Sequence, residues 1–236
     1  MTSKLSIANI DRFVFAGDAV VTLVRPARAI KRTVEFAARE ETGEPPHQPV
    51  VVEELDPEVR FTYRVQRAES EDADRPWFVK VLTGPDNLRD YSFVGTIFPG
   101  ESGEVAYRHS ARKSRIGEDA ASVRGIAWLV GHLSALRTLS AENVGADLFR
   151  KPEIGDDALP HVQALAKVEV YHEDRCGRCS RRLTTPQSVT LGIGPDCAEI
   201  MGLGPLDLLA RAIGSDPIQP DPSSEPPETP ETPPGC

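Results

Sequence analysis

The sequence lacks any unbroken apolar run of about 18 residues, which is the length that a transmembrane helix requires. Its opening residues, MTSKLSIANIDRF, also lack the long apolar stretch of a secretory signal. Cysteine is scarce, with four among 236 residues, and three of the four are closely spaced. Such spacing suits a metal site in a reducing compartment better than a disulfide framework. We therefore expect a cytoplasmic protein that has no membrane association.

Motifs that mark common catalytic sites are absent as well. The sequence contains no H-E-x-x-H, P-loop, G-x-S-x-G or Rossmann fingerprint. A zinc deaminase requires H-x-E together with P-C-x-x-C, and His172-Glu173 has the wrong spacing. Scattered carboxylates such as Asp86, Asp90 and Glu118 leave open a nuclease or other hydrolase, although scattered acids are mostly solvated surface. The sequence thus favours a non-enzymatic protein, with a hydrolase as the weaker alternative.

Basic residues are fewer than acidic ones: the chain has 27 Lys and Arg against 36 Asp and Glu, which gives a net charge of -9. This balance argues against indiscriminate binding of polyanions. Acid is concentrated at the end of the chain, where residues 215–236 contain dense proline and no basic residue. Such a composition cannot offset the entropy of ordering, so we predict a disordered tail that ends in an unpaired thiol at Cys236.

Short segments that alternate apolar and polar residues predict β-strands in the first part of the chain. The predicted strands cover residues 13–24, with a turn at Gly17-Asp18, and residues 60–67, 76–84, 91–98 and 105–110. Because the connections between them are short, neighbouring strands are expected to run antiparallel. Residues 25–57 interrupt this pattern as an insertion, and their sequence does not decide between helix and strand.

One segment, residues 118–138, has the periodicity of a long helix, with Ile126, Leu129 and Leu133 at helical spacing. Gly125 and Gly131 within it predict close packing at both positions, since glycine otherwise weakens a helix. Shorter helices are predicted at residues 158–166, 198–201 and 205–213.

The fold class that these elements predict is α+β, with an antiparallel β-meander packed against one long helix and a small C-terminal zinc module. The predicted domain boundaries are residues 1–150 for the sheet and helix, 151–214 for the zinc module and 215–236 for the tail.

Three cysteines gather in the segment that starts at Val168. Cys176 and Cys179 are two residues apart, which places two thiolates on one tight turn. Gly177 lies inside this turn and is expected to adopt a backbone conformation closed to residues with a Cβ. Cys197 follows a predicted helix start, where the positive end of a helix favours a thiolate.

His172 lies just ahead of these cysteines and completes a set of one histidine and three cysteines. This is the composition of a closed, four-coordinate structural site that holds one Zn²⁺. The fourth ligand is the open part of the prediction, because Asp174, His161 or Asp196 could replace His172.

The residues CGRCSRRLTTPQSVTLGIGPDC resemble a small zinc-finger-like domain of unknown function found in proteins of bacteriophages and their hosts. In that family C-G-x-C is followed by an L-T-x-P-x-S-like segment and by G-I-G-P-x-C. The resemblance implies a structural zinc ion held by Cys176, Cys179, Cys197 and His172. Ser180 departs from the family, which commonly has glycine there. RFTYRV, PWFVKVLTGPDN and YSFVGTI are also similar to the N-terminal half of phage proteins that carry this finger.

Basic side chains form two clusters that are candidates for nucleic-acid contacts, because a guanidinium can donate two hydrogen bonds to one phosphate. The first cluster comprises Arg108, Arg112, Lys113 and Arg115, and the second comprises Arg175, Arg178, Arg181 and Arg182. The alternative is that both clusters are ordinary solvated surface.

Aromatic residues on the predicted strands offer stacking faces for unpaired bases, unless they belong to the core. These residues are Trp77, Tyr91, Phe93 and Tyr107. The sequence therefore favours an accessory protein of phage type that binds DNA or RNA. The alternative is an inhibitor or adaptor whose acidic loops bind a host protein.

Overall fold

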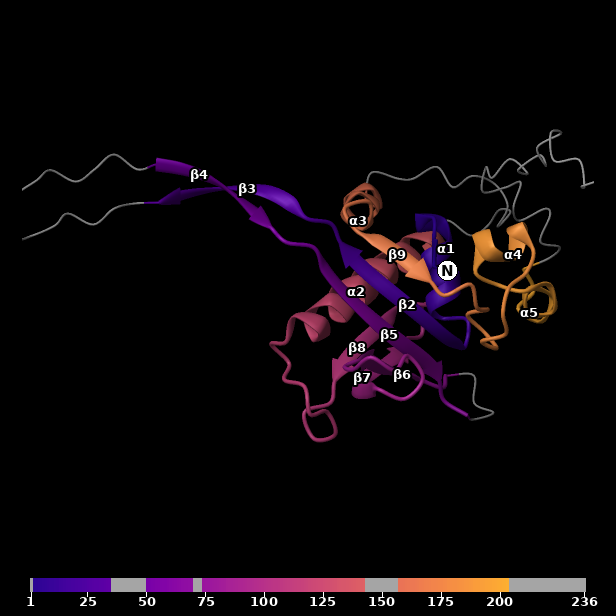
Figure 1. Cartoon of the computed structure of the whole chain (residues 1–236). Coiled ribbons are helices and arrows are strands. Elements are labelled where there is room, and N and C mark those ends of the chain that lie inside the picture. Colours follow the sequence, from indigo (N-terminus) through magenta and orange to yellow (C-terminus); the bar gives the residue numbers. More distant parts are fainter. Residues whose placement is uncertain (1, 35–49, 70–73, 143–156, 204–236) are drawn as a thin grey trace, which may run out of the picture.

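The computed structural model describes residues 2–34, 50–69, 74–142 and 157–203, and its centre is a seven-stranded antiparallel sheet (Figure 1). The strand order is β1-β9-β2-β5-β6-β7-β8. In chain order the strands are β1 (Ser3–Lys4), β2 (Asp18–Arg25), β5 (Val59–Arg67), β6 (Trp77–Leu82), β7 (Tyr91–Pro99), β8 (Val105–His109) and β9 (Glu169–His172). Together with the helices, this sheet confirms the predicted α+β class.

The meander from β5 to β8 follows the predicted strands closely, because each strand has one buried and one open face. In β6, Trp77, Val79 and Val81 are at most 5% exposed, while Phe78 between them is 42% exposed. This alternation is the period-two pattern that the sequence shows.

The strand β9 extends the sheet beyond the predicted boundary at residue 151. It lies between β1 and β2, and His172 pairs with Ser3 on one side and Val21 on the other. The segment that leads into the cysteines is therefore a strand of the main sheet, paired on both sides and second from its edge.

The helix α1 (Ile7–Val14) ends where the first strand of the segment 13–24 was predicted, and residues 15–17 turn the chain, so the strand predicted before Gly17 is wrong. Ile10, Phe13 and Val14 are at most 2% exposed and lie on one side of the helix. The run FVF also fits a strand when it is considered alone. The helix instead buries Ile10 together with Phe13 and Val14, which follow it by three and four residues, and the short strand pattern did not reveal this helical spacing. The turn at Gly17 and the strand that follows it are confirmed.

The helix α2 (Ala121–Glu142) starts three residues later than predicted and packs its apolar side on the sheet. Gly125 is required there, because an added Cβ would lie 2.8 Å from the Tyr63 hydroxyl. Gly131 has nothing within 4 Å of such a Cβ, so the predicted close packing at this second glycine is wrong.

Two further helices share the cover of the sheet with α2. Residues of α1 join the same core as α2, and α3 (Leu159–Leu165) adds Leu165 to it. A description with one covering helix is therefore too simple. No helix within the residues described is long and apolar enough to cross a membrane.

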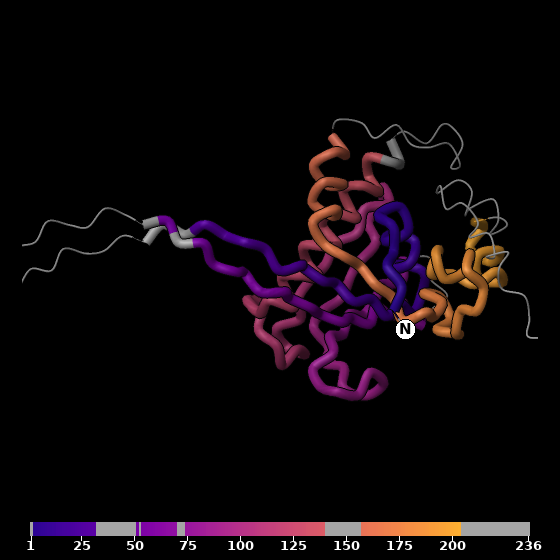
Figure 2. Tube along the Cα trace, turned by 45° about the horizontal axis from the view of Figure 1, so that its top comes forward, coloured from indigo at the N-terminus to yellow at the C-terminus, as the bar shows by residue number. Residues whose placement is uncertain are grey.

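The predicted insertion is a two-stranded arm that projects from the body (Figures 1 and 2). It consists of β3 (Arg28–Val34) and β4 (Val50–Asp56), and its tip lies outside the described residues. Arg25 pairs with Val59 in the sheet, and Arg28 pairs with Asp56 in the arm. The register is thus unchanged, and the arm continues the β2–β5 hairpin past Pro26 and Pro57, which cannot donate ladder hydrogen bonds.

Two short helices complete the described chain after β9. They are α4 (Pro186–Leu191), which the sequence analysis missed, and α5 (Pro195–Ile200), which starts before the predicted helix at 198–201. The helix predicted at 205–213 and the tail predicted at 215–236 lie outside the described residues.

Candidate metal centre

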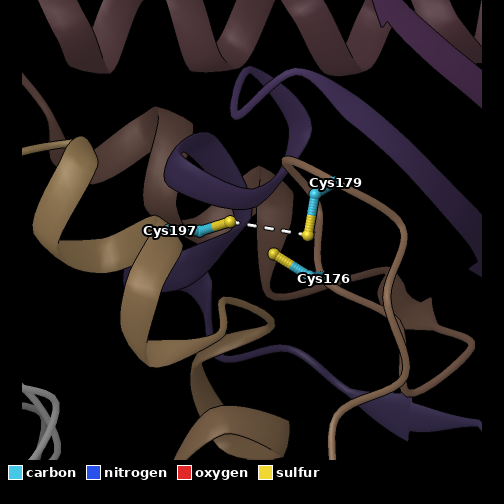
Figure 3. Close-up of side chains that lie close together, drawn as sticks. All are labelled: Cys176, Cys179 and Cys197. Atoms are coloured by element: carbon cyan, nitrogen blue, oxygen red, sulfur yellow. Dashed lines mark hydrogen bonds between the residues drawn. The ribbon is translucent and has the colours of Figure 1, made fainter.

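The side chains of Cys176, Cys179 and Cys197 point toward one another and form a compact group (Figure 3). Their sulfur atoms all lie within 4.8 Å of one another, and 3.5 Å separates the Sγ atoms of Cys179 and Cys197. Two thiolates on one tetrahedral zinc ion lie about 3.8 Å apart, because each Zn–S bond is about 2.3 Å long. The group can therefore hold a metal ion of this size with little movement.

The first two cysteines sit on a tight turn that aims backbone N–H groups at sulfur. Ser180 closes the turn, since its N–H donates to the Cys176 carbonyl at 2.8 Å, and it adopts a φ of 56°. This left-handed conformation costs a residue with a Cβ about 1–2 kcal/mol, which gives a physical reason for the glycine that the resembling family commonly has.

Gly177 is required in the turn for a reason other than the predicted one. Its φ is not positive, so the expected special backbone conformation is wrong. An added Cβ would instead lie 2.7 Å from the Phe13 carbonyl oxygen and 2.8 Å from the Phe13 ring. The glycine allows α1 to pack directly against the cysteine turn.

The surroundings shift the pKa values of Cys176 and Cys197 in opposite directions. Burial raises the pKa of Cys176, but N–H donors of Gly194, Arg178 and Cys179 outweigh this effect and hold the pKa below its usual value. Burial and the other two sulfur atoms raise the pKa of Cys197. A bound divalent cation would reverse that increase, because it stabilises all three thiolates together.

Two short helices position the third cysteine, because α4 lies between the second and third cysteines and α5 contains the third. Thr185 caps α4 by accepting from the Ser188 N–H at 3.4 Å, and Pro186 occupies the first helical position. Gly192 ends this helix with a φ of 71°. Gly194 is the N-cap of α5 without a side-chain hydrogen bond, and Pro195 follows it at the start of the helix, as Pro186 does in α4. The caps explain why the L-T-x-P-x-S and G-I-G-P-x-C spacing delivers Cys197 to the group.

His172 is buried, and it is not part of the three-cysteine group. Its Nε2 atom lies 2.9 Å from the Val189 carbonyl oxygen, which can only accept, so Nε2 carries the proton. Its Nδ1 atom has no hydrogen-bond partner among the described residues. The assignment of His172 as the fourth ligand therefore stays a prediction.

The three alternative fourth ligands also lie apart from the sulfur group as the structure describes it. His161 on α3 faces His132 on α2, with 2.9 Å between their Nδ1 atoms. Asp174 accepts from the Ser3 hydroxyl at 2.6 Å, and Asp196 is an exposed residue in the first turn of α5.

Residues 173–203, called the metal segment below, are attached to the body through the corner between α1 and β2. Ala16 of this corner belongs to the same small core as Cys176 and Cys197. The Asp18 N–H donates to the Gly177 carbonyl at 2.7 Å, and the Ser180 hydroxyl donates to the Asp18 carbonyl at 3.0 Å. The metal segment is thus a docked part of the protein.

The two basic clusters lie on different parts of the molecule. The first is on β8, at one edge of the sheet, and on the loop toward α2. The second is on the metal segment, which follows β9 near the other edge. Every member is exposed except Arg178, which is half-buried, and none forms a salt bridge with a carboxylate of the described residues.

The predicted stacking residues divide between core and surface. Trp77 is 5% exposed and packs edge-on against Phe15, while the Tyr107 hydroxyl donates to the Val94 carbonyl. Both therefore belong to the core side of the sheet. Tyr91 and Phe93 are half-buried.

The sequence analysis missed Phe78 and Phe98, which are 42% and 40% exposed. Both alternate with buried residues along their strands, so the period-two pattern contained the signal that could have found them.

Comparison with known proteins extends the description of the metal segment. Residues 166–202 match the model of a family of unknown function (DUF6011). No curated protein and no solved structure matches the chain. The matched region contains β9, all three cysteines and both short helices, and it fits a small metal-binding module of zinc type without assigning an activity.

Proposed function

We propose that the protein is a non-enzymatic accessory protein of phage type, which binds nucleic acid and depends on one zinc ion for its fold. The observation that carries the proposal is the exposure of the two basic clusters, without a described carboxylate to neutralise either of them. In a protein with a net charge of -9, such local clusters provide the attraction to phosphate that the whole chain lacks.

Zinc suits the site because thiolates are soft ligands and the sulfur atoms are spaced for tetrahedral coordination. Three thiolates and one further ligand, for which His172 is our candidate, form a closed site. A closed site leaves no position for an activated water, so the ion would act through structure rather than catalysis.

The metal segment also presents its arginines from a fixed backbone. Arg175 and Arg182 form a β-bridge, and the Arg175 guanidinium donates to the Ser180 carbonyl at 3.0 Å. Arg182 of this bridge and Arg181 beside it are both exposed. Holding these groups in place lowers the entropy that phosphate binding would otherwise cost.

The test is a titration of labelled oligonucleotides with the zinc-loaded protein at several salt concentrations, read by fluorescence anisotropy. Each lost phosphate contact lowers the slope of log K against log salt by about 0.7 to 0.9. We expect Arg181→Ala with Arg182→Ala to weaken binding and reduce this slope. The charge-matched control is Arg89→Ala with Arg124→Ala, because both are exposed outside the clusters. Binding that is absent, or equal in both variants, contradicts the proposal.

The arm supports a second candidate function, which is the binding of a host protein. Val51 and Leu55 are 58% and 67% exposed, and they lie four residues apart on the same face of β4, a strand that projects from the body. Glu53 lies between them and forms a salt bridge with Lys31 across the arm. Exposed apolar residues with charges around them are typical of protein-binding surfaces. Capture of a specific protein that is lost when the arm is shortened would favour this function over nucleic-acid binding.

A further inference from the structure

The face of the sheet that points away from the helices carries aromatic side chains on β6 and β7 and a cation on β8. Val79 and Ile97 are fully buried on the helix side, so their neighbours along the strands point the other way. Phe78 pairs with Thr96, and Thr96 pairs with Arg108, which places all three on this open face.

Two phenylalanines lie close together there, and a third lies farther along β7. The Phe78 and Phe93 rings are 6.4 Å apart in an edge-on arrangement, and a shift of register after Val79 brings Phe93 opposite Lys80. Phe98 follows on the same strand, and its ring lies 5.4 Å from the guanidinium carbon of Arg108. We call Phe78, Phe93, Phe98, Lys80 and Arg108 the aromatic face.

Along β6, β7 and β8 the charge on this face is of one sign, whereas Asp18 of β2 lies farther along the same cross-strand row and is paired with Arg64. Strands β6, β7 and β8 contain Lys80 and Arg108 but no acidic residue, in a chain whose net charge is -9. The Lys80 ammonium donates to the neutral Gln66 amide at 3.0 Å, which orients the cation without neutralising it. The strand β8 then leads directly into the first basic cluster.

Cross-strand packing explains part of this arrangement, because aromatic pairs stabilise sheets. It does not explain why Phe78 and Phe98 remain about 40% exposed beside two cations on strands without acid. A partner that offers both planar rings and negative charge would match both features. Single-stranded nucleic acid has this chemistry, whereas the ring faces of a duplex are stacked inside it.

We propose that the aromatic face binds single-stranded nucleic acid, with bases stacked on Phe78 and Phe98 and phosphates at Lys80 and Arg108. This inference rests on the proposed nucleic-acid binding and names its substrate class. It also replaces the predicted stacking residues Trp77, which is buried, and Tyr107, which packs against the core, with two phenylalanines that the sheet exposes.

The test measures the affinity of the zinc-loaded full chain for oligo(dT) and oligo(U) of about 12 nucleotides and for a duplex of equal length. We expect single strands to bind more tightly than the duplex. Loss of one stacking side chain weakens binding by about fivefold to a hundredfold, so Phe78→Ala and Phe98→Ala should each fall in this range. Phe98→Tyr should retain most of the affinity, because it keeps a stacking ring.

The matched control is Leu159→Ala, which removes a side chain of similar exposure, 44%, from α3 on the helix side of the sheet. Its affinity should stay within about twofold of the unchanged protein, since surface substitutions away from a site have small effects. Phe98→Leu keeps an apolar side chain of similar size and removes only the aromatic ring, so it tests stacking even where an alanine variant fails to fold.

The outcomes separate this inference from the function on which it rests. Equal affinity of the phenylalanine variants and the control, or a preference for the duplex, would overturn the aromatic face and leave nucleic-acid binding in place. Absence of binding to every oligonucleotide would overturn both. Weakening by Phe98→Leu with rescue by Phe98→Tyr is the result expected from stacking.

Discussion

The metal segment and the arm are both small, and the protein stabilises them in opposite ways. The metal segment buries Cys176, Leu183 and Ile193 in a core that it shares with Ala16 of the body. The side chains of the arm that the structure describes form no such core, and Val51 and Leu55 remain more than half exposed. Its strands are held by a register that continues from the large sheet. The metal segment is therefore built into the body, while the described strands of the arm join the body at their base.

The largest effect should follow loss of a cysteine ligand. Cys176→Ser or Cys197→Ser should abolish tight zinc binding and lower the free energy of unfolding by about 4 kcal/mol or more, as loss of a structural metal does. Native mass spectrometry and thermal unfolding measure the two effects. Cys236→Ser is the matched control, and an equal loss of zinc in this variant would place a ligand in the tail and contradict our ligand set.

The next effect concerns the contact between α1 and the cysteine turn. Gly177→Ala forces a methyl group against the Phe13 carbonyl and should destabilise the protein by about 1–3 kcal/mol, which is typical of overpacking. Gly131→Ala adds the same methyl group at an open position of α2 and should stabilise it by up to about 1 kcal/mol. Chemical denaturation compares the two, and equal effects would show that the α1 contact is not tight.

A smaller effect is expected at Ser180, which joins the metal segment to β2. Ser180→Ala loses the hydrogen bonds from its hydroxyl to Asp18 and should cost about 1–2 kcal/mol. Ser180→Gly loses the same bonds but relieves the left-handed backbone strain, so it should be nearly neutral. Denaturation curves in which glycine is the worse of the two would contradict this account of the turn.

The smallest effect should come from shortening the arm. Replacing residues 26–58 by Asn-Gly joins Arg25 to Val59, which are already paired, and Asn-Gly is the preferred two-residue hairpin turn. The lost salt bridge between Arg25 and Asp56 is partly exposed and contributes less than about 1 kcal/mol. The melting temperature of the body should therefore hardly change. A large decrease would show that the arm supports the sheet.

Local sequence patterns predicted the elements whose packing is local. The meander from β5 to β8 follows from alternation, and α2 follows from the spacing of Ile126, Leu129 and Leu133. The cysteine group follows from the two-residue spacing of Cys176 and Cys179 and from the helix start before Cys197. In each case the residues that interact are near one another in the chain or repeat with a fixed period.

The remaining features depend on contacts that no local pattern contains. Placement of β9 between β1 and β2 joins His172 to Ser3 across most of the chain, and alternation gives no information about strand order. Phe13 is the reason that position 177 requires glycine, and this contact exists only after α1 has packed on the cysteine turn. The sequence did not decide between helix and strand in the arm, because a two-stranded ribbon exposed on both faces needs no regular apolar spacing.

The most direct test of the account is hydrogen exchange of the zinc-loaded protein with and without a chelator. If the metal segment is built into the body, chelation should remove protection from it and also from β9 and the start of β2, where the Asp18 N–H donates to the Gly177 carbonyl. Exchange in the arm should not change. Loss of protection confined to residues 173–203 would contradict the central claim, because it would show that the metal segment folds without supporting the sheet.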